Sequence, residues 1–230
     1  MLEIKQKVLE SNKDIVDLGL VIGSFGNASQ RYNESILIKP SGVKIDKIIA
    51  DDIVCVNTKS GKYSGEYKPS TDTPTHIELY NHFPEIGGIV HTHSMYATAW
   101  AQSCMSIPCL GTTHGDYWNG DVPITRRLND DEINKEYEKE TGKVIIEKIK
   151  ELQINPLDCP GILVSNHGPF AWGSSIEDAV KNAETLEYVA KLAWLTIDIN
   201  PNITNISNTL LGKHFSRKHG QKSYYGQEKD

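Results

Sequence analysis

Four short runs of β-branched and aliphatic residues, each closed by a glycine, proline or polar turn, most constrain how this chain can fold. They are SILIKPSG (35–42), DDIVCVN (51–57), GGIVHTH (87–93) and GILVSNHG (161–168). Runs of this length suit strands of a sheet, and segments with apolar residues at helical spacing separate and follow them. The pattern predicts an α/β fold: a single domain (1–230) with a mixed central β-sheet flanked by helices.

The two longest predicted helices begin at residues that cap helices well. Asn129 stands three residues before Glu132, and Ser175 stands three residues before Asp178. We expect the first of these helices to break at Gly142. The predicted helices span about 2–18, 72–83, 94–104, 129–152, 175–197 and 208–220.

The charge balance and the cysteine pattern exclude several classes of protein. The 24 basic residues are outnumbered by 30 acidic ones, which gives a net charge of −6 and argues against binding to a nucleic-acid backbone. The four cysteines lack Cys-x-x-Cys spacing, so we expect reduced thiols. The N-terminal segment is charged and no window approaches a membrane span, so we expect no membrane contact and a cytoplasmic location.

A His-x-His pair, His91 and His93, ends the third strand run. Residues i and i+2 of a strand point to the same side, so both imidazoles should leave one face together. Two adjacent neutral imidazoles suit a bound dication, although two polar residues on a wet strand are the alternative. His167 follows the fourth strand run and is a third candidate ligand. Asp72 is the fourth, and plain N-capping of the next helix is its alternative.

Three imidazoles and one carboxylate suit Zn²⁺, and a catalytic site must also leave room for a substrate. The remaining histidines carry less weight. We expect His76 and His82 to be surface or packing residues, and the sequence assigns no role to His114 or His214.

Three turns rich in glycine and serine can bind an anion. They are GSFGNAS (23–29), KPSG (39–42) and PST (69–71). Successive backbone N–H groups in such turns form phosphate-sized nests, and the third turn also precedes a predicted helix N-terminus. Neither Walker nor Rossmann spacing is present, so no nucleotide is implied.

Seven motifs in order along the chain resemble the class II aldolase family, and within it the L-ribulose-5-phosphate 4-epimerases. They are GNAS, KPSG, STDTPTH, GGIVHTHS, GTTHGDYWNG, SNHGPFAWG and YYGQ. The resemblance implies a three-layer fold and a cyclic homotetramer with active sites at subunit borders. It also implies that the C-terminal helix and tail, about 207–230, contribute to a subunit interface.

The same resemblance implies roles for individual residues. The zinc ligands would be Asp72, His91, His93 and His167. The residues that contact the substrate and its phosphate would be Gly26, Asn27, Ser41, Gly42, Ser70 and Thr71, with Asp72 beside them. Asp116 and Tyr225 would transfer protons as acid and base. Thr71 departs from the family's usual serine but keeps the hydroxyl, and Phe25 stands where tryptophan is common.

The implied activity is zinc-dependent epimerisation of L-ribulose 5-phosphate to D-xylulose 5-phosphate at C4. The C4 hydrogen is not acidic, so cleavage and re-formation of the C3–C4 bond replaces simple proton removal. One alternative is a class II sugar-phosphate aldolase similar to L-fuculose-phosphate aldolase, in which a glutamate stands in the place of Asp72. The other is a non-catalytic protein whose zinc only braces the fold. The pathway, whether arabinose or ascorbate breakdown, is not distinguished by the sequence.

Overall fold

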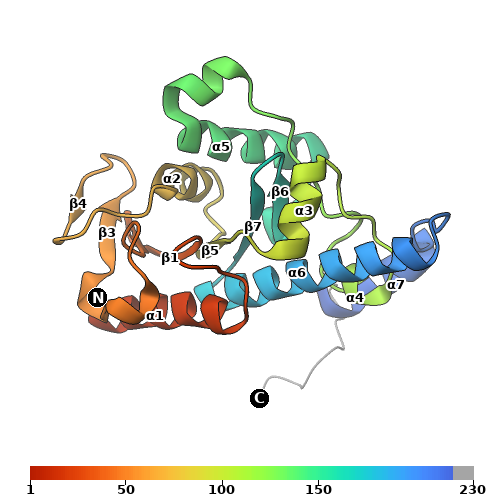
Figure 1. Cartoon of the computed structure of the whole chain (residues 1–230), viewed down its shortest axis with the longest axis horizontal. Helices are drawn as coiled ribbons and strands as arrows, with labels where there is room; N and C mark the ends of the chain where they lie inside the picture. Colours follow the sequence, from red (N-terminus) through yellow and green to blue (C-terminus); the bar gives the residue numbers. More distant parts are fainter. Residues whose placement is uncertain (220–230) are drawn as a thin grey trace.

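A seven-stranded sheet forms the centre of the computed structural model, which describes residues 1–219 (Figure 1). Its strands are β1 (Asn27–Tyr32), β2 (Ser35–Ile38), β3 (Val54–Asn57), β4 (Tyr63–Ser64), β5 (Gly88–His91), β6 (Gly161–Val164) and β7 (Gly168–Gly173). They lie in the order β4-β3-β2-β1-β5-β7-β6. Tyr225, one of the two predicted acid/base residues, lies outside the described residues.

Neighbouring strands in this sheet run antiparallel throughout. The predicted α/β class, with one central sheet flanked by helices, is confirmed. The expected mixture of strand directions is wrong for these pairs: over residues 1–219 it is reduced to one isolated parallel bridge, between Ile124 and Leu163. Tight turns are the physical reason for the pairs β1–β2 and β6–β7, because two strands joined by a tight turn must run antiparallel. Asn33 adopts a left-handed conformation (φ 53°) in the turn between β1 and β2.

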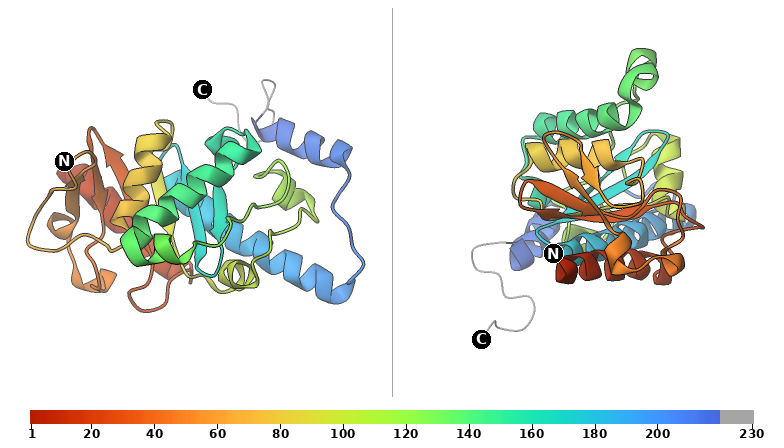
Figure 2. Two further views of the ribbon diagram at one scale, coloured as in Figure 1. Left: turned by 90° about the horizontal axis from the view of Figure 1, so that it is seen from above. Right: turned by 90° about the vertical axis from the view of Figure 1, so that its left-hand side faces the viewer.

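Helices cover both faces of the sheet and produce three layers (Figure 2). One face carries α1 (Leu2–Asp17) and α6 (Ile176–Ile199), and the other carries α2 (Thr73–His82) and α5 (Asp130–Leu152). The helix α3 (Met95–Ser103) packs against β7 and α6. At the far end of the molecule, α4 (Thr112–Gly115) packs against α7 (Asn208–His219).

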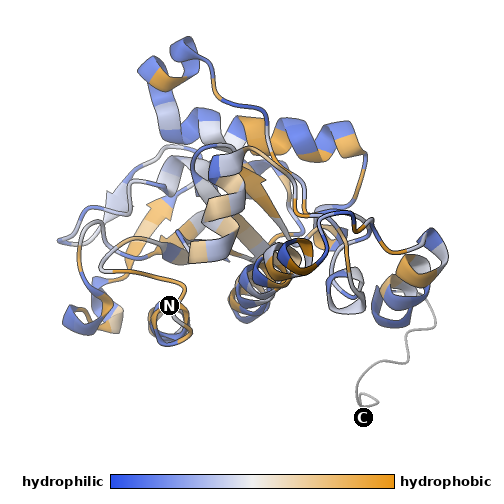
Figure 3. Ribbon diagram, turned by 45° about the vertical axis from the view of Figure 1, so that its right-hand side comes forward, coloured by the Kyte–Doolittle hydropathy of each residue, from blue (hydrophilic) through white to orange (hydrophobic). Residues whose placement is uncertain are grey.

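The strand β2 shows how one sheet serves two cores. Ile36 and Ile38 pack with buried residues of α2, whereas Leu37 between them packs with buried residues of α1 and α6. This follows from the alternation of side chains across a strand. Several strands are accordingly hydrophobic, between layers of helices whose outer sides carry polar residues (Figure 3). Within residues 1–219 no helix has the length and apolar character needed to cross a membrane.

The predicted starts of the two long helices are confirmed. The side chain of Asn129 accepts a hydrogen bond from the backbone of Glu132, and Ser175 caps α6 in the same way. The predicted break in α5 is displaced, because the non-helical residue is Glu136 (φ −128°, ψ 64°) and Gly142 is helical. The reason for the glycine is close packing: a Cβ at Gly142 would lie 2.7 Å from Cβ of Glu78 in α2.

Candidate metal centre

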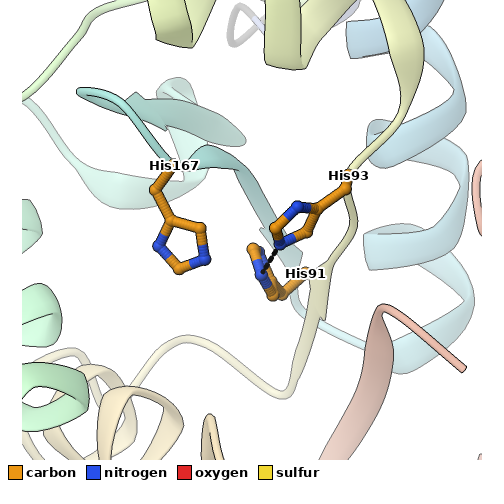
Figure 4. Close-up of side chains that lie close together, drawn as sticks. All are labelled: His91, His93 and His167. Carbon is orange, nitrogen blue, oxygen red and sulfur yellow. Dashed lines mark hydrogen bonds between the residues drawn. The ribbon is translucent and has the colours of Figure 1, made fainter.

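Three histidines from two adjacent segments of the sheet converge on one point (Figure 4). His91 is the last residue of β5, His93 lies two residues beyond it, and His167 lies in the turn between β6 and β7. β5 pairs with β7, so the sheet itself brings the two segments together. One ring nitrogen from each residue lies within 4.8 Å of the other two, and Nε2 of His91 is 3.2 Å from Nε2 of His93.

The protein fixes the orientation of His91 from two sides. Its Nδ1 lies 3.0 Å from the carbonyl oxygen of Pro169, and its ring stacks on Phe170 with centroids 4.1 Å apart. A carbonyl oxygen only accepts hydrogen bonds, so Nδ1 carries the proton and Nε2 presents a lone pair. This backbone contact is the kind of second-shell interaction that sets the tautomer of a metal-binding histidine.

The neutral state of the other two imidazoles also suits a metal. Burial, reinforced by its histidine neighbours, lowers the pKa of His167 to about 3. Burial and then the charge of His91 lower the pKa of His93 in the same direction. At neutral pH these rings are therefore unprotonated donors, and three such nitrogens around one point fit a divalent cation. The chain can hold a divalent metal ion here through His91, His93 and His167.

Asp72 lies beside this cluster but not within its tightest group. It occupies the N-cap position of α2, yet its carboxylate makes no capping hydrogen bond and instead accepts one from Nδ2 of Asn27 at 2.7 Å. The capping alternative is therefore wrong. Burial opposes ionisation of Asp72, but His91, His76 and the Asn27 amide outweigh it and lower its pKa. Asp72 is therefore an ionised carboxylate next to the histidines.

A pocket of about 270 Å³ opens next to the cluster. Every residue predicted to contact the substrate or its phosphate lines it: Gly26, Asn27, Ser41, Gly42, Ser70, Thr71 and Asp72. The sheet explains this meeting, because Asn27 pairs with His91 across β1 and β5. Backbone hydrogen bonds hold the KPSG turn beside the PST turn. The N–H of Ser41 donates to the carbonyl oxygen of Lys68, and the N–H of Ser70 donates to that of Lys39.

Two details of the pocket wall point to a polar ligand. Gly26 has a φ of +97°, and a Cβ there would lie 3.0 Å from the carbonyl oxygen of His91, so only glycine lets the turn approach this closely. Oδ1 of Asn27 is buried, and it has no hydrogen-bond partner among residues 1–219. A buried acceptor without a partner is costly, and a ligand hydroxyl in the pocket would satisfy it.

Lys39 is a pocket residue that the sequence analysis did not select. It lines the same pocket, is only 6% exposed, and its Nζ lies 3.4 Å from the carbonyl oxygens of Ser24 and Pro40. Burial lowers its pKa, while the nearby charge of Asp72 acts against that shift. Its place at the start of the KPSG turn was a signal, since a lysine in a turn predicted to bind an anion offers a positive charge there.

Asp116 does not lie in this pocket. It follows α4, and Arg217 of α7 binds both of its oxygens, with Nε 2.9 Å from Oδ1 and Nη2 2.6 Å from Oδ2. Nδ1 of His214 lies 3.0 Å from Oδ1. Burial alone would raise the pKa of Asp116, but these hydrogen bonds outweigh it and lower that pKa. Asp116 is thus an ionised carboxylate held between α4 and α7, which lie at the right of Figure 1, away from α2.

The remaining histidines fall into two groups. His76 is a packing residue, as predicted: it is fully buried, with Nδ1 2.7 Å from Oγ of Ser29. His82 is exposed and His114 is buried against Trp118. A larger cavity, about 680 Å³ near Trp118 and the end of α5, contains none of the predicted site residues.

Residues 6–194 match the Class II Aldolase and Adducin N-terminal domain family. The match spans most of the sequence, so the chain belongs to this family. Solved structures share its fold. An L-fuculose 1-phosphate aldolase superposes with a TM-score of 0.77 at 23% identity, covering 92% of this chain and 94% of its own.

Two further structures give the same result. YgbL from Klebsiella pneumoniae, a candidate aldolase/epimerase/decarboxylase, has a TM-score of 0.71 at 25% identity and covers 92% of this chain and 97% of its own. A sugar-phosphate aldolase from Thermotoga maritima has a TM-score of 0.67 at 18% identity, with 87% and 97% covered. The three-layer fold is therefore that of the class II aldolases.

Proposed function

We propose that this chain is a zinc-dependent L-ribulose-5-phosphate 4-epimerase that acts in the cytoplasm. One observation carries the proposal: three histidines converge beside a pocket whose wall is built from the three turns predicted to bind an anion and from a buried lysine. A cluster that only braced the fold would have no reason to adjoin such a pocket. A phosphorylated sugar with vicinal oxygens near the metal matches both halves of the site.

Different residues of the chain would bind different parts of the substrate. Lys39, the hydroxyls of Ser41 and Ser70, and the N-terminus of α2 would hold the phosphate and neutralise its charge. Oδ1 of Asn27 would accept a hydrogen bond from a hydroxyl of the sugar. His91, His93, His167 and Asp72 would hold Zn²⁺. When bound, the zinc ion supplies a Lewis acid that stabilises negative charge developing on the substrate's oxygens as the C3–C4 bond breaks.

Proton transfer at the C4 oxygen needs two groups, one on each face of the aldehyde that turns during epimerisation. We assign these roles to Asp116 and Tyr225 of a neighbouring subunit, since Asp116 does not line the pocket of its own chain. Arg217 and His214 hold its carboxylate in place and favour the ionised form.

An exposed apolar face supports a homotetramer with active sites at subunit borders. A groove of about 430 Å³ is lined mainly by Met95, Tyr96, Trp100, Met105 and Trp194. Met95 and Trp194 are 70% and 51% exposed, and Met95 follows His93 by two residues. A subunit that covered this apolar face would therefore approach the metal centre.

A class II sugar-phosphate aldolase is the second candidate, favoured by the names of the L-fuculose 1-phosphate and sugar-phosphate aldolases among the structural neighbours. Asp72 argues for the epimerase. Its carboxylate is shorter than the glutamate expected at this position of an aldolase, and it is already engaged with Asn27 beside the histidines. A side chain so placed suits metal ligation better than proton delivery to a substrate.

The decisive experiment incubates the purified, zinc-analysed protein with L-ribulose 5-phosphate and follows all products. The epimerase yields D-xylulose 5-phosphate without accumulation of two fragments, whereas accumulating fragments indicate an aldolase. No turnover despite one bound zinc ion per chain favours the structural-zinc alternative.

We predict that two variants separate metal binding from proton transfer. His93→Asn lowers the zinc content because it removes one imidazole donor from the cluster. Tyr225→Phe leaves the zinc content unchanged but slows epimerisation severely, by a factor on the order of 10²–10⁴. Full zinc occupancy in His93→Asn would mean that the ligand set is wrong, and normal turnover in Tyr225→Phe would remove Tyr225 from the mechanism.

A further inference from the structure

A tyrosine outside the predicted site contacts the third histidine of the cluster. The hydroxyl oxygen of Tyr137 lies 3.4 Å from Nδ1 of His167, and the two ring centroids are 6.0 Å apart. Tyr137 belongs to α5, far in sequence from β5 and from the β6–β7 turn. Figure 4 shows the other ring nitrogen of His167 turned toward His91, so the nitrogen that faces the cluster is the one Tyr137 does not touch.

The local structure places Tyr137 at this point. The helical path of α5 is broken at Glu136, directly before Tyr137, and the first turns of the helix project from the body of the molecule (Figures 1 and 3). After the break, Thr141 donates a hydrogen bond from Oγ1 to the carbonyl oxygen of Tyr137 at 2.9 Å. The tyrosine therefore stands at the start of the regular part of α5.

The helix α2 holds this part of α5 in place. The hydroxyl of Thr75 donates to the carbonyl oxygen of Glu138, and Gly142 allows the two helices to approach closely enough for the contact. The same α2 begins at Asp72, beside the histidines. The contact between these two helices thus helps to place both Asp72 and Tyr137 beside the cluster.

We infer that Tyr137 is a positioning residue for the metal centre, whose hydroxyl accepts the Nδ1 proton of His167 and thereby presents its Nε2 lone pair to the metal. The inference rests on the metal site of the proposed function but not on which sugar phosphate is turned over. His91 is oriented in the same way by the carbonyl oxygen of Pro169. A hydroxyl differs from a carbonyl because it can also donate, so its effect depends on the metal selecting the Nδ1-protonated tautomer.

The hydroxyl of Tyr137 is neutral at neutral pH, as a tyrosine side chain ordinarily is. A neutral oxygen can accept the imidazole proton without adding another negative charge beside Asp72. The contact is therefore a hydrogen bond that orients His167 rather than an additional ligand.

The test measures the Zn²⁺ dissociation constant by competition with a chromophoric chelator. We expect Tyr137→Phe to weaken zinc binding about 10–100-fold, the usual effect of losing a second-shell partner, while the metal-free protein unfolds at the same temperature as the parent. Tyr63→Phe is the matched control: Tyr63 is exposed on β4, so this variant should bind zinc like the parent.

A double-mutant cycle separates positioning through His167 from a general structural effect. In a His167→Asn background, Tyr137→Phe should cause no further loss of zinc affinity, because the group it orients is gone. Equal losses in both backgrounds would overturn the inference, as would parental affinity in Tyr137→Phe. A parent protein that binds no zinc at all would instead overturn the metal site of the proposed function, and this inference with it.

Discussion

At the scale of single residues, three buried histidines make the folded chain sensitive to acid. Burial, as the largest cause in each case, lowers the pKa of His76 and of His167 to about 3 and that of His114 to about 4. In the unfolded chain these groups titrate near 6.5. Below that pH the unfolded state binds protons that the folded state does not, so stability falls as the pH drops from about 6.5 toward 4.

We therefore predict that the unfolding temperature of the metal-free protein declines steadily over this range in calorimetry. Each histidine contributes at most about 1.4 kcal/mol per pH unit. His114→Gln should make the decline shallower, because Nε2 of His114 is buried and has no hydrogen-bond partner among residues 1–219. His82→Gln, at an exposed position, is the control and should keep the parental slope. A slope as steep in His114→Gln as in the parent would contradict the prediction.

Single residues of the centre differed in how far their positions could be predicted. The sequence spacing of His91 and His93 was enough to predict that their imidazoles lie together at the end of β5. Lys39 could not be selected from composition, since lysine is buried only where particular partners surround it. The place of Tyr137 beside the cluster could not be predicted from the sequence. It depends on the break in α5 at Glu136 and on the approach of α5 to α2, and neither was indicated at its position by a local pattern.

At the scale of elements, the close approach of α5 to α2 is the contact that organises the site. A Cβ at Gly142 would meet Cβ of Glu78 at 2.7 Å and the carbonyl oxygen of Thr75 at 3.1 Å. We expect Gly142→Ala to lower the free energy of unfolding by about 1–2 kcal/mol in urea titration, because overpacking outweighs alanine's helix preference of about 1 kcal/mol.

The matched variant is Gly212→Ala in α7. A Cβ there would meet nothing within 4 Å, so the helix preference of alanine acts alone and should raise stability by up to about 1 kcal/mol. The two substitutions are chemically identical but should change stability in opposite directions. The same sign at both positions would show that the α2–α5 contact is looser than the structure indicates.

Three strands of the sheet were not predicted: the two-residue β4, and β1 and β7, both of which have atypical sequences. The polar sequence of β1 (NASQRY) lacks the expected β-branched pattern, and a tertiary partner supports it: Asn12 forms hydrogen bonds with both backbone groups of Ala28. The strand β7 (GPFAWG) contains a proline and two glycines, which usually argue against a strand interior. Only long-range contacts make these segments strands, whereas the helix caps at Asn129 and Ser175 are local and were predicted.

At the scale of the whole molecule, the candidate metal centre and the carboxylate proposed to transfer a proton lie in different parts of the chain. The histidine cluster belongs to the ends of β5 and β6, whereas Asp116 is bound between α4 and α7. Sequence motifs identified both sets of residues but carry no information on the distance between them. The arrangement of separate chains depends on surface shape and apolar area, which no local pattern encodes.

The apolar face beside α3 makes the assembly testable. Trp194 is 51% exposed on α6, and its ring lies 6.0 Å from that of Tyr96. We predict that Trp194→Glu dissociates the proposed tetramer in analytical ultracentrifugation and lowers turnover at least about tenfold, because a buried unpaired charge costs several kcal/mol at an interface.

Zinc binding should survive in that variant, since His91, His93 and His167 all belong to one chain. Ile49→Glu is the control: this residue is 65% exposed outside the apolar face, so the charge should leave both assembly and turnover unchanged. A Trp194→Glu protein that remains tetrameric would show that this face is not the interface. A dissociated protein with full turnover would show instead that a single chain contains every group the reaction needs.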